Sequence, residues 1–225
     1  MDEIPDWSPR PRPARTPLEG RYCRLEPLHP VHHGGELFDA SMADGAVERF
    51  RYLFDAPQDR TRFDEWLNKA AASEDPMFYA VIDLATKRCE GRQTLMRVTP
   101  EHGVIEIGNI LWGPAIARTR VATEALFLFA RHVFEDLGYR RFEWKCNALN
   151  EPSRRAALRF GFSFEGLFRQ HMVVKGQNRD TAWYAMIDAE WPALCRAFEA
   201  WLDSANFDAE RKQTARLEDF RQPAR

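Results

Sequence analysis

The sequence predicts one α/β domain in which a mixed, mostly antiparallel central sheet is flanked by helices. Three observations lead to this fold class. Residues 77–112 alternate as an antiparallel meander, a strand–loop–helix–strand unit follows it, and a short helix and a hairpin come next. The 225 residues correspond to roughly 1.5 domains at about 150 residues each, which we interpret as one domain with extra segments.

Apolar periodicity predicts the first half of the chain element by element. A strand is expected over 21–28, and helices over 30–42 and 59–73, the second because Phe63, Trp66, Leu67 and Ala70 recur at helical spacing. Alternation then predicts strands at 77–84, 93–98 and 104–112.

The second half begins with a helix over 122–137 that carries an apolar stripe and ends before Gly138, a natural left-handed stop. A strand over 141–148 follows. Asn150 opens a short helix that ends at Gly161. The remaining elements are expected to be strands at 162–174 and 180–187 and an amphipathic helix at 190–202.

Composition excludes several classes of protein. There are 32 basic and 34 acidic residues, so the net charge of −2 suits neither a basic nucleic-acid coat protein nor an acidic disordered chain. No stretch approaches the roughly 18 apolar residues of a membrane span, and no basic-then-apolar leader is found. The four cysteines form no C-x-x-C pair, so we expect reduced thiols and a cytoplasmic protein. From the charge balance and the absence of a long apolar stretch, we expect neither a nucleic acid nor a membrane as partner.

The predicted domain covers 18–204 and has an extension at each end. Residues 1–17 hold five of the 14 prolines with arginines between them, which predicts an extended arm that either lies on the domain or docks a partner. Residues 205–225 have mixed charge and are expected to be loosely held.

Motifs of other enzyme classes are missing. The chain has no G-x-S-x-G, no G-x-G-x-x-G and no Walker pattern. His29, His32 and His33 lie together where a helix begins, without a second ligand group, so exposed or capping roles are favoured over a metal site. No metal is expected.

The chemistry is expected where the strand over 104–112 leads through a loop into the next helix. A helix start leaves backbone N–H groups unpaired and carries a partial positive charge, which suits a phosphate or pyrophosphate. Arg118 and Arg120 add charge there. The strand end also offers backbone groups to an extended, amide-bearing ligand, and coenzyme A contains both parts.

Residues 21–191 resemble the GNAT superfamily of CoA-dependent N-acetyltransferases, and most closely its RimJ/RimL-like branch of ribosomal-protein N-terminal acetyltransferases. Each fragment is weak alone, but their order and spacing agree over about 80 residues. The matching segments are 106–108 (Glu-Ile-Gly), 122–125 (Ala-Thr-Glu-Ala), 137–141 (Leu-Gly-Tyr-Arg-Arg), 150–153 (Asn-Glu-Pro-Ser), 161–166 (Gly-Phe-Ser-Phe-Glu-Gly) and 179–184 (Arg-Asp-Thr-Ala-Trp-Tyr).

The resemblance implies transfer of an acetyl group from acetyl-CoA to a primary amine, by direct attack in a ternary complex. The amine is either a protein N-terminal α-amine or a small-molecule amine. Backbone N–H groups near Ile110 and Leu111 are expected to stabilise the oxyanion. Contacts with acetyl-CoA are expected from Ile110, Leu111, Trp112, Arg118, Thr119, Arg120, Val121, Ala122, Thr123, Asn150, Ser153 and Arg154.

Two positions depart from the family pattern. The acetyl-CoA loop usually reads Q/R-x-x-G-x-G/A, but here Ala117 takes the Gln/Arg position, Arg120 takes a glycine position and only Ala122 fits. Either Arg120 keeps ordinary dihedrals, or the loop opens and the arginines contact phosphate directly. Ala157 stands where many members carry a tyrosine acid, and Ser153 matches the substitute of the RimJ/RimL-like branch.

Several roles stay open at this point. Glu106, in an apolar run, is either the general base or a carboxylate that forms a salt bridge or binds substrate. Asn150 is a helix N-cap, a contact for the pantetheine arm, or both. Ser153 suits positioning of the sulfur better than proton donation. The competing class is a non-catalytic acyl-CoA sensor or interaction module on the same fold, and a homodimer is left open.

Overall fold

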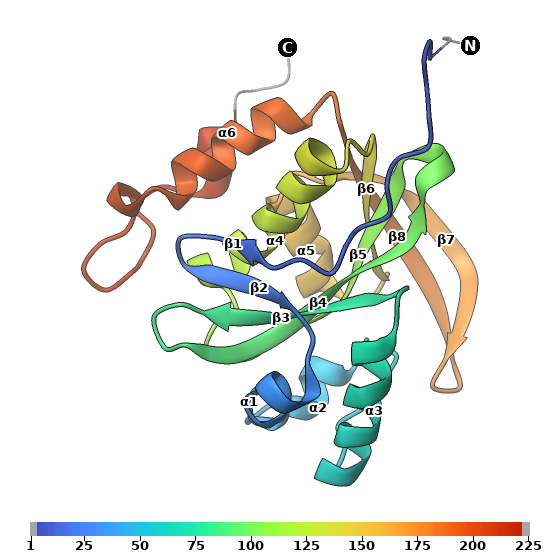
Figure 1. Cartoon of the computed structure of the whole chain (residues 1–225), viewed down its shortest axis with the longest axis vertical. Helices are drawn as coiled ribbons and strands as arrows, with labels where there is room; N and C mark the ends of the chain where they lie inside the picture. Colours follow the sequence, from blue (N-terminus) through green and yellow to red (C-terminus); the bar gives the residue numbers. More distant parts are fainter. Residues whose placement is uncertain (1–3, 222–225) are drawn as a thin grey trace.

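The computed structural model describes residues 4–221, and within them eight strands form one sheet in the order β1-β2-β3-β4-β5-β6-β8-β7 (Figure 1). Neighbouring strands are antiparallel except β5 and β6, which are parallel. The strands are β1 (Leu18–Glu19), β2 (Cys23–Pro27), β3 (Met77–Asp83), β4 (Arg88–Thr99), β5 (Val104–Trp112), β6 (Arg141–Asn147), β7 (Ser163–Val174) and β8 (Gln177–Ile187). The predicted α/β fold class is confirmed.

Helices cover both faces of this sheet (Figure 1). One face packs against α4 and α6 through a core that includes Tyr79, Val81, Ile105 and Ile107, and the other packs against α1 and α3 through a smaller core around Phe78. The helices are α1 (Pro30–Met42), α2 (Ala46–Phe50), α3 (Arg60–Ala72), α4 (Arg120–Arg131), α5 (Glu151–Arg159) and α6 (Trp191–Leu202). Because side chains alternate along a strand, Glu106 between Ile105 and Ile107 points to the α1–α3 face.

The start of α4 differs slightly from the sequence prediction. The Oγ1 atom of Thr119 accepts a hydrogen bond from the N–H of Val121 at 3.2 Å, so the helix is capped there and begins at Arg120 instead of residue 122. After Arg131 the helix continues as one π-helical turn, η2 (His132–Asp136), before Gly138 turns the chain with φ +67°. The helix predicted over 122–137 is therefore continuous, but its last turn is π-helical instead of α-helical.

The N-terminal arm lies on the domain in the part that the structure describes. Tyr79 and Tyr139 donate hydrogen bonds to the carbonyls of Ala14 at 3.0 Å and Pro11 at 3.1 Å, and the N–H of Arg10 donates to the carbonyl of Pro100 at 3.0 Å. Residues 1–3 of the predicted arm lie outside the described residues.

The C-terminal segment packs more closely than its charge led us to expect. Leu217, in the turn η4 (Leu217–Phe220), is 1% exposed and belongs to the main core beside α6. Trp201 donates from Nε1 to Oε1 of Gln213 at 3.0 Å, and Asn206 holds Ala215 through two further hydrogen bonds. The expectation of a loosely held tail is wrong at Asn206 and Leu217, which are buried, whereas residues 208–214 are exposed. Residues 222–225 lie outside the described part.

Within residues 4–221, none of the helices combines the length and the apolar character needed to span a bilayer.

Candidate active site

The parallel strands β5 and β6 separate halfway along their length. Their pairing runs from Val104 with Arg141 to Ile107 with Trp144, and the register gives no pair beyond that level. In β5 a bulge follows directly. Asn109 has φ +49°, and it stands with Ile110 opposite Gln93 alone on β4. Because β6 no longer pairs with β5 beyond Ile107, backbone groups of β5 are left free at the opening between the two strands.

Two hollows border this region, and they share no lining residue. The larger one, about 1060 Å³, lies at the start of α4 and beside α5. The smaller one, about 120 Å³, lies beside β5, β6 and β8 and is closed by the loop after α2. The larger hollow is lined by the predicted Trp112, Arg118, Thr119, Arg120, Val121, Ala122 and Thr123, and the smaller by Glu106, Ile110, Asn150 and Ser153.

The larger hollow is suited to anions. Within residues 4–221 the N–H groups of Arg120 and Ala122, at the start of α4, have no hydrogen-bond acceptor in the protein. A helix start with free N–H groups binds phosphate. The ionisable side chains of the lining are mostly cationic: Arg21, Arg118, Arg120, Arg159, Arg211 and Lys212, against Asp83 and Glu210. These residues fit the phosphates of coenzyme A.

Arg120 occupies its glycine position without a strained backbone. It is the first residue of α4, and the left-handed residue of the loop is Arg118, with φ +64°. The guanidinium of Arg120 lies over the rings of Tyr22 at 4.1 Å and Phe207 at 5.1 Å. The loop therefore keeps ordinary dihedrals at Arg120, and its side chain forms part of the cleft wall.

Thr119 and Thr123 hold the loop to the helices around it. Thr119 donates from Oγ1 to the carbonyl of Ile116 at 2.7 Å, and Thr123 donates to the carbonyl of Thr119 at 3.2 Å. Arg159 of α5 donates to Oγ1 of Thr123 at 3.2 Å. These contacts fix the helix start at which an anion would lie.

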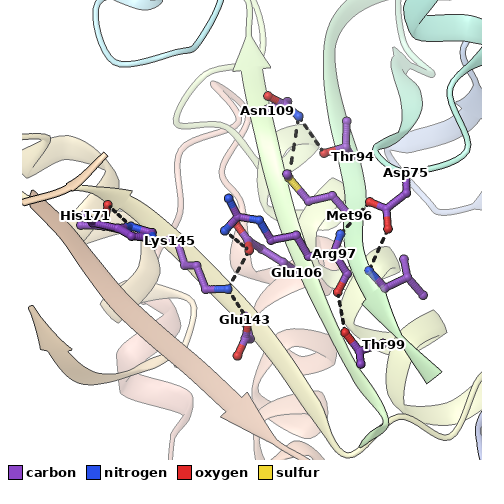
Figure 2. A network of polar contacts seen from close by, with 12 residues as sticks. Asp75, Thr94, Met96, Arg97, Thr99, Glu106, Asn109, Glu143, Lys145 and His171 are labelled. Atoms are coloured by element: carbon purple, nitrogen blue, oxygen red, sulfur yellow. Dashed lines mark hydrogen bonds and ion pairs between the residues drawn. The ribbon is translucent and has the colours of Figure 1, made fainter. Parts of the chain in front are cut away.

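Glu106 is buried and doubly ion-paired on the smaller hollow (Figure 2). Its Oε2 atom lies 2.9 Å from Nζ of Lys145 and 3.1 Å from a terminal nitrogen of Arg97, and the residue is 4% exposed. Burial raises the pKa of Glu106 above its usual value, while Lys145 and Arg97 limit the rise. The salt bridge is thus present, and a raised pKa also suits a general base.

Asn150 and Ser153, at the start of α5, line the same hollow. The Oδ1 atom of Asn150 accepts from the N–H of Ser153 at 3.2 Å, so Asn150 does cap the helix. The Oγ atom of Ser153 accepts from Nε1 of Trp144 at 3.0 Å. The hydroxyl of Ser153 also lies within hydrogen-bond reach of the Cys146 thiol, so a ligand atom in the opening would compete with that sulfur for the hydroxyl hydrogen.

Two predicted acetyl-CoA contacts lie elsewhere. Arg154 lines neither hollow, because it donates from Nε to the hydroxyl of Tyr184 at 3.2 Å and pairs with Glu151 at 2.7 Å. The side chain of Leu111 is 3% exposed and also lines neither. Only its backbone is placed at the strand opening.

The sequence reasoning missed the partners of Glu106 and the wall formed by the C-terminal segment. The alternation of Phe142, Trp144 and Cys146 toward the core could have placed Lys145 on the Glu106 face. No sequence signal indicated that Arg211 and Lys212 line the larger hollow. Across the described range 4–221, no group of three or more His, Cys, Asp or Glu side chains is arranged to hold a metal.

The family model for the acetyltransferase (GNAT) domain matches residues 24–163, and the chain therefore belongs to the GNAT acetyltransferase family. Enzymes of this family take the acetyl group from acetyl-CoA, so the protein is an N-acetyltransferase by family and not merely by fold. Among curated proteins, none matches the chain significantly.

Solved structures agree with this assignment. A GCN5-related N-acetyltransferase from Brucella melitensis is 57% identical, with a TM-score of 0.95 over 96% of this chain and 99% of that one. A probable acetyltransferase of the GNAT family from Chromobacterium violaceum is 38% identical, with a TM-score of 0.79 over 86% and 96%. RimL, a ribosomal alpha-N-protein acetyltransferase in complex with coenzyme A, is 19% identical, with a TM-score of 0.65 over 77% and 99%, and shares the fold.

Proposed function

We propose that this protein transfers the acetyl group of acetyl-CoA directly to a primary α-amine, with both substrates bound at once. The cofactor would lie in the larger hollow with its phosphates at the start of α4, and the amine would enter from the smaller one. The N–C bond then forms as the C–S bond breaks, and one amine proton leaves. The smaller hollow beside the strand opening and the larger one at the end of β5 support such a ternary arrangement.

The observation that carries the proposal is the position of Glu106. It is the carboxylate that lines the smaller hollow together with Ile110 and Ser153, and burial raises its pKa. A base with a raised pKa accepts a proton more readily near neutral pH. Glu106 thus serves as the base for the amine, while Arg97 and Lys145 hold it in place.

The other residues of the opening would act on the acetyl group and the sulfur. Free N–H groups at the bulge near Ile110 would stabilise the oxyanion. Ser153, fixed by Trp144, would hydrogen-bond the sulfur as it gains charge. The thiolate leaves tolerably by itself, since a free thiol has a pKa of about 8.5.

An α-amine suits this single base better than a lysine side chain. At pH 7 an α-amine of pKa near 7.8 is about one-seventh neutral, whereas a lysine amine near 10.4 is about one part in 2,500 neutral. The similar fold of RimL supports placing this chain in the RimJ/RimL-like branch, with a protein N-terminus as one form of the acceptor and a small amine as the other. A cytoplasmic location belongs to the same proposal and is supported by four free cysteines among the described residues.

The test is a screen for amine-dependent release of coenzyme A from acetyl-CoA. The panel contains peptides with different N-terminal residues, the same peptides with blocked α-amines and free lysines, and small amines. We expect turnover with free α-amines and little with the blocked peptides. Binding of coenzyme A with no turnover on any amine would contradict the proposal and favour an acyl-CoA sensor.

A further inference from the structure

Arg179 is a buried cation on the smaller hollow without an anionic partner. The residue lies on β8 and is 6% exposed, and it lines the hollow beside Asn150 and Ser153. Its Nε atom donates to Oγ1 of Thr181 at 3.3 Å, and its guanidinium lies 5.0 Å from the ring centre of Phe54. Among residues 4–221, no carboxylate lies within 4.0 Å of it.

Burying the charge of Arg179 costs free energy unless a ligand with the opposite charge pairs with it. A buried charge is usually paired, and Arg92, the other deeply buried arginine of the described chain, has Asp55 as its partner. Burial also lowers the pKa of Arg179, because the charged form is less stable away from water. The two terminal nitrogens of Arg179 have no hydrogen-bond acceptor within residues 4–221. They are not fully buried, so they face the hollow.

The other cations of the hollow are already engaged. Arg97 and Lys145 pair with Glu106, and Arg49 donates to the carbonyls of Ser41 and Asp44. His171 bonds Thr181 through Nδ1 at 2.9 Å, and burial with nearby arginines lowers its pKa. Among the described residues that line this hollow, Arg179 is therefore the arginine whose two terminal nitrogens have no acceptor and are free for a ligand.

We propose that Arg179 binds a carboxylate of the acceptor, so that the enzyme acts on an amine that carries a carboxylate a few bonds away. This inference rests on the proposed function of the same site. Arginine presents two parallel N–H donors that match a carboxylate, which gives both affinity and orientation.

The small volume of the hollow limits the size of the acceptor. Arg179 and Ser153 line the same hollow of about 120 Å³, so the amine and the carboxylate of the acceptor must be only a few bonds apart. A free amino acid and a peptide with an acidic N-terminal residue both meet this condition, and both offer the same carboxylate chemistry.

The experiment compares matched acceptors with the wild type and with Arg179→Gln. Peptides that begin with Asp and Asn, or Glu and Gln, form isosteric pairs, and free amino acids are compared with their carboxamides. We expect the wild type to favour the carboxylate by about 10- to 150-fold in kcat/KM, and Arg179→Gln to reduce this ratio to near one while it still acetylates the neutral acceptor. Arg179→Lys should keep part of the preference. Arg155→Ala, an exposed arginine of α5 outside both hollows, should keep all of it.

The outcomes separate the two proposals. A wild type that acetylates α-amines without preferring the carboxylate overturns the role of Arg179 alone. A wild type that acetylates no amine overturns the proposed function, and calorimetry of the same acceptor pairs on the CoA-loaded protein then decides whether Arg179 binds carboxylates. Thermal unfolding and CoA affinity of each variant show whether the fold is intact. If Arg179→Gln does not fold, the wild type is compared with Arg179→Lys instead.

Discussion

The Nζ atom of Lys145 lies 2.9 Å from Oε2 of Glu106 and 2.6 Å from Oε2 of Glu143, so one buried ammonium joins two carboxylates of adjacent parallel strands (Figure 2). The same ammonium lies 3.9 Å from the ring centre of Trp183. The ammonium of Lys145 is therefore held by its two carboxylate partners and the Trp183 ring. It acts on Glu106, whose carboxylate form it favours.

Replacing Lys145 with methionine should raise the pKa of Glu106 further. Burial already raises this pKa and Lys145 opposes the rise, so removing the ammonium leaves a larger fraction of Glu106 protonated near neutral pH. If Glu106 is the base, the acidic limb of the kcat/KM profile moves to higher pH. Arg97→Met should move it in the same direction but less, because Arg97 is 40% exposed and the weaker influence. A limb that stays in place in both variants would show that Glu106 does not govern it.

Ser153→Ala should slow turnover without abolishing it. The loss of one hydrogen bond to the charged sulfur costs about 1.5–3 kcal/mol, or roughly 10- to 150-fold in kcat. The high-pH limb of the rate profile should not move, because Ser153 is not expected to ionise. The exposed Ser163 of β7 offers a matched control whose alanine variant should retain full activity. Complete loss of turnover with CoA still bound would make Ser153 an essential acid.

Coenzyme A should bind more weakly when Arg118 and Arg120 are both replaced with alanine. Both line the larger hollow at the helix start, and their attraction for phosphate is screened by salt, so the loss should be greater at low than at high ionic strength. Titration calorimetry at two salt concentrations measures this, with Arg155→Ala as a control that removes one positive charge from outside the hollow. Equal affinity of the double variant and the wild type would place the phosphates elsewhere.

Leu217→Ala should destabilise the whole domain. Leu217 is 1% exposed in the main core, and such truncations cost about 2–5 kcal/mol. Val47, at 78% exposed, is the matched control and should change the free energy of unfolding by less than about 0.5 kcal/mol when it is replaced with alanine. Chemical denaturation measures both. A Leu217→Ala variant as stable as the control would mean that the C-terminal segment is dispensable for the fold.

The parts of the fold that the sequence predicted are those with several turns of regular periodicity. Residues 30–42 and 104–112 match α1 and β5 to the residue. The helix α2 has five residues, too few for an amphipathic pattern, and it was not predicted. The strand β4 begins five residues before the predicted 93, because a bulge near Val81 interrupts its register with β3 and with it the alternation.

The candidate site was predicted where a single residue broke a local pattern. Glu106 was noticeable because a carboxylate in an apolar run needs a reason. Its partners are set by strand register and by the left-handed backbone of Arg97, with φ +49°, and neither can be read from spacing along the chain. Phe207 and Arg211 reach the larger hollow only because the C-terminal segment folds back beside Tyr22.

Glu106→Gln tests whether Glu106 is the base, because it keeps the size of the side chain and removes the carboxylate. The measurement is kcat/KM against pH for the wild type and the variant, with one α-amine acceptor and with CoA affinity measured in parallel. We expect a loss of about 10²-fold or more in kcat/KM, no acidic limb in the variant, and nearly unchanged CoA affinity. A variant whose turnover and pH profile match those of the wild type would contradict the account and leave Glu106 with the structural role that its two ion pairs already provide.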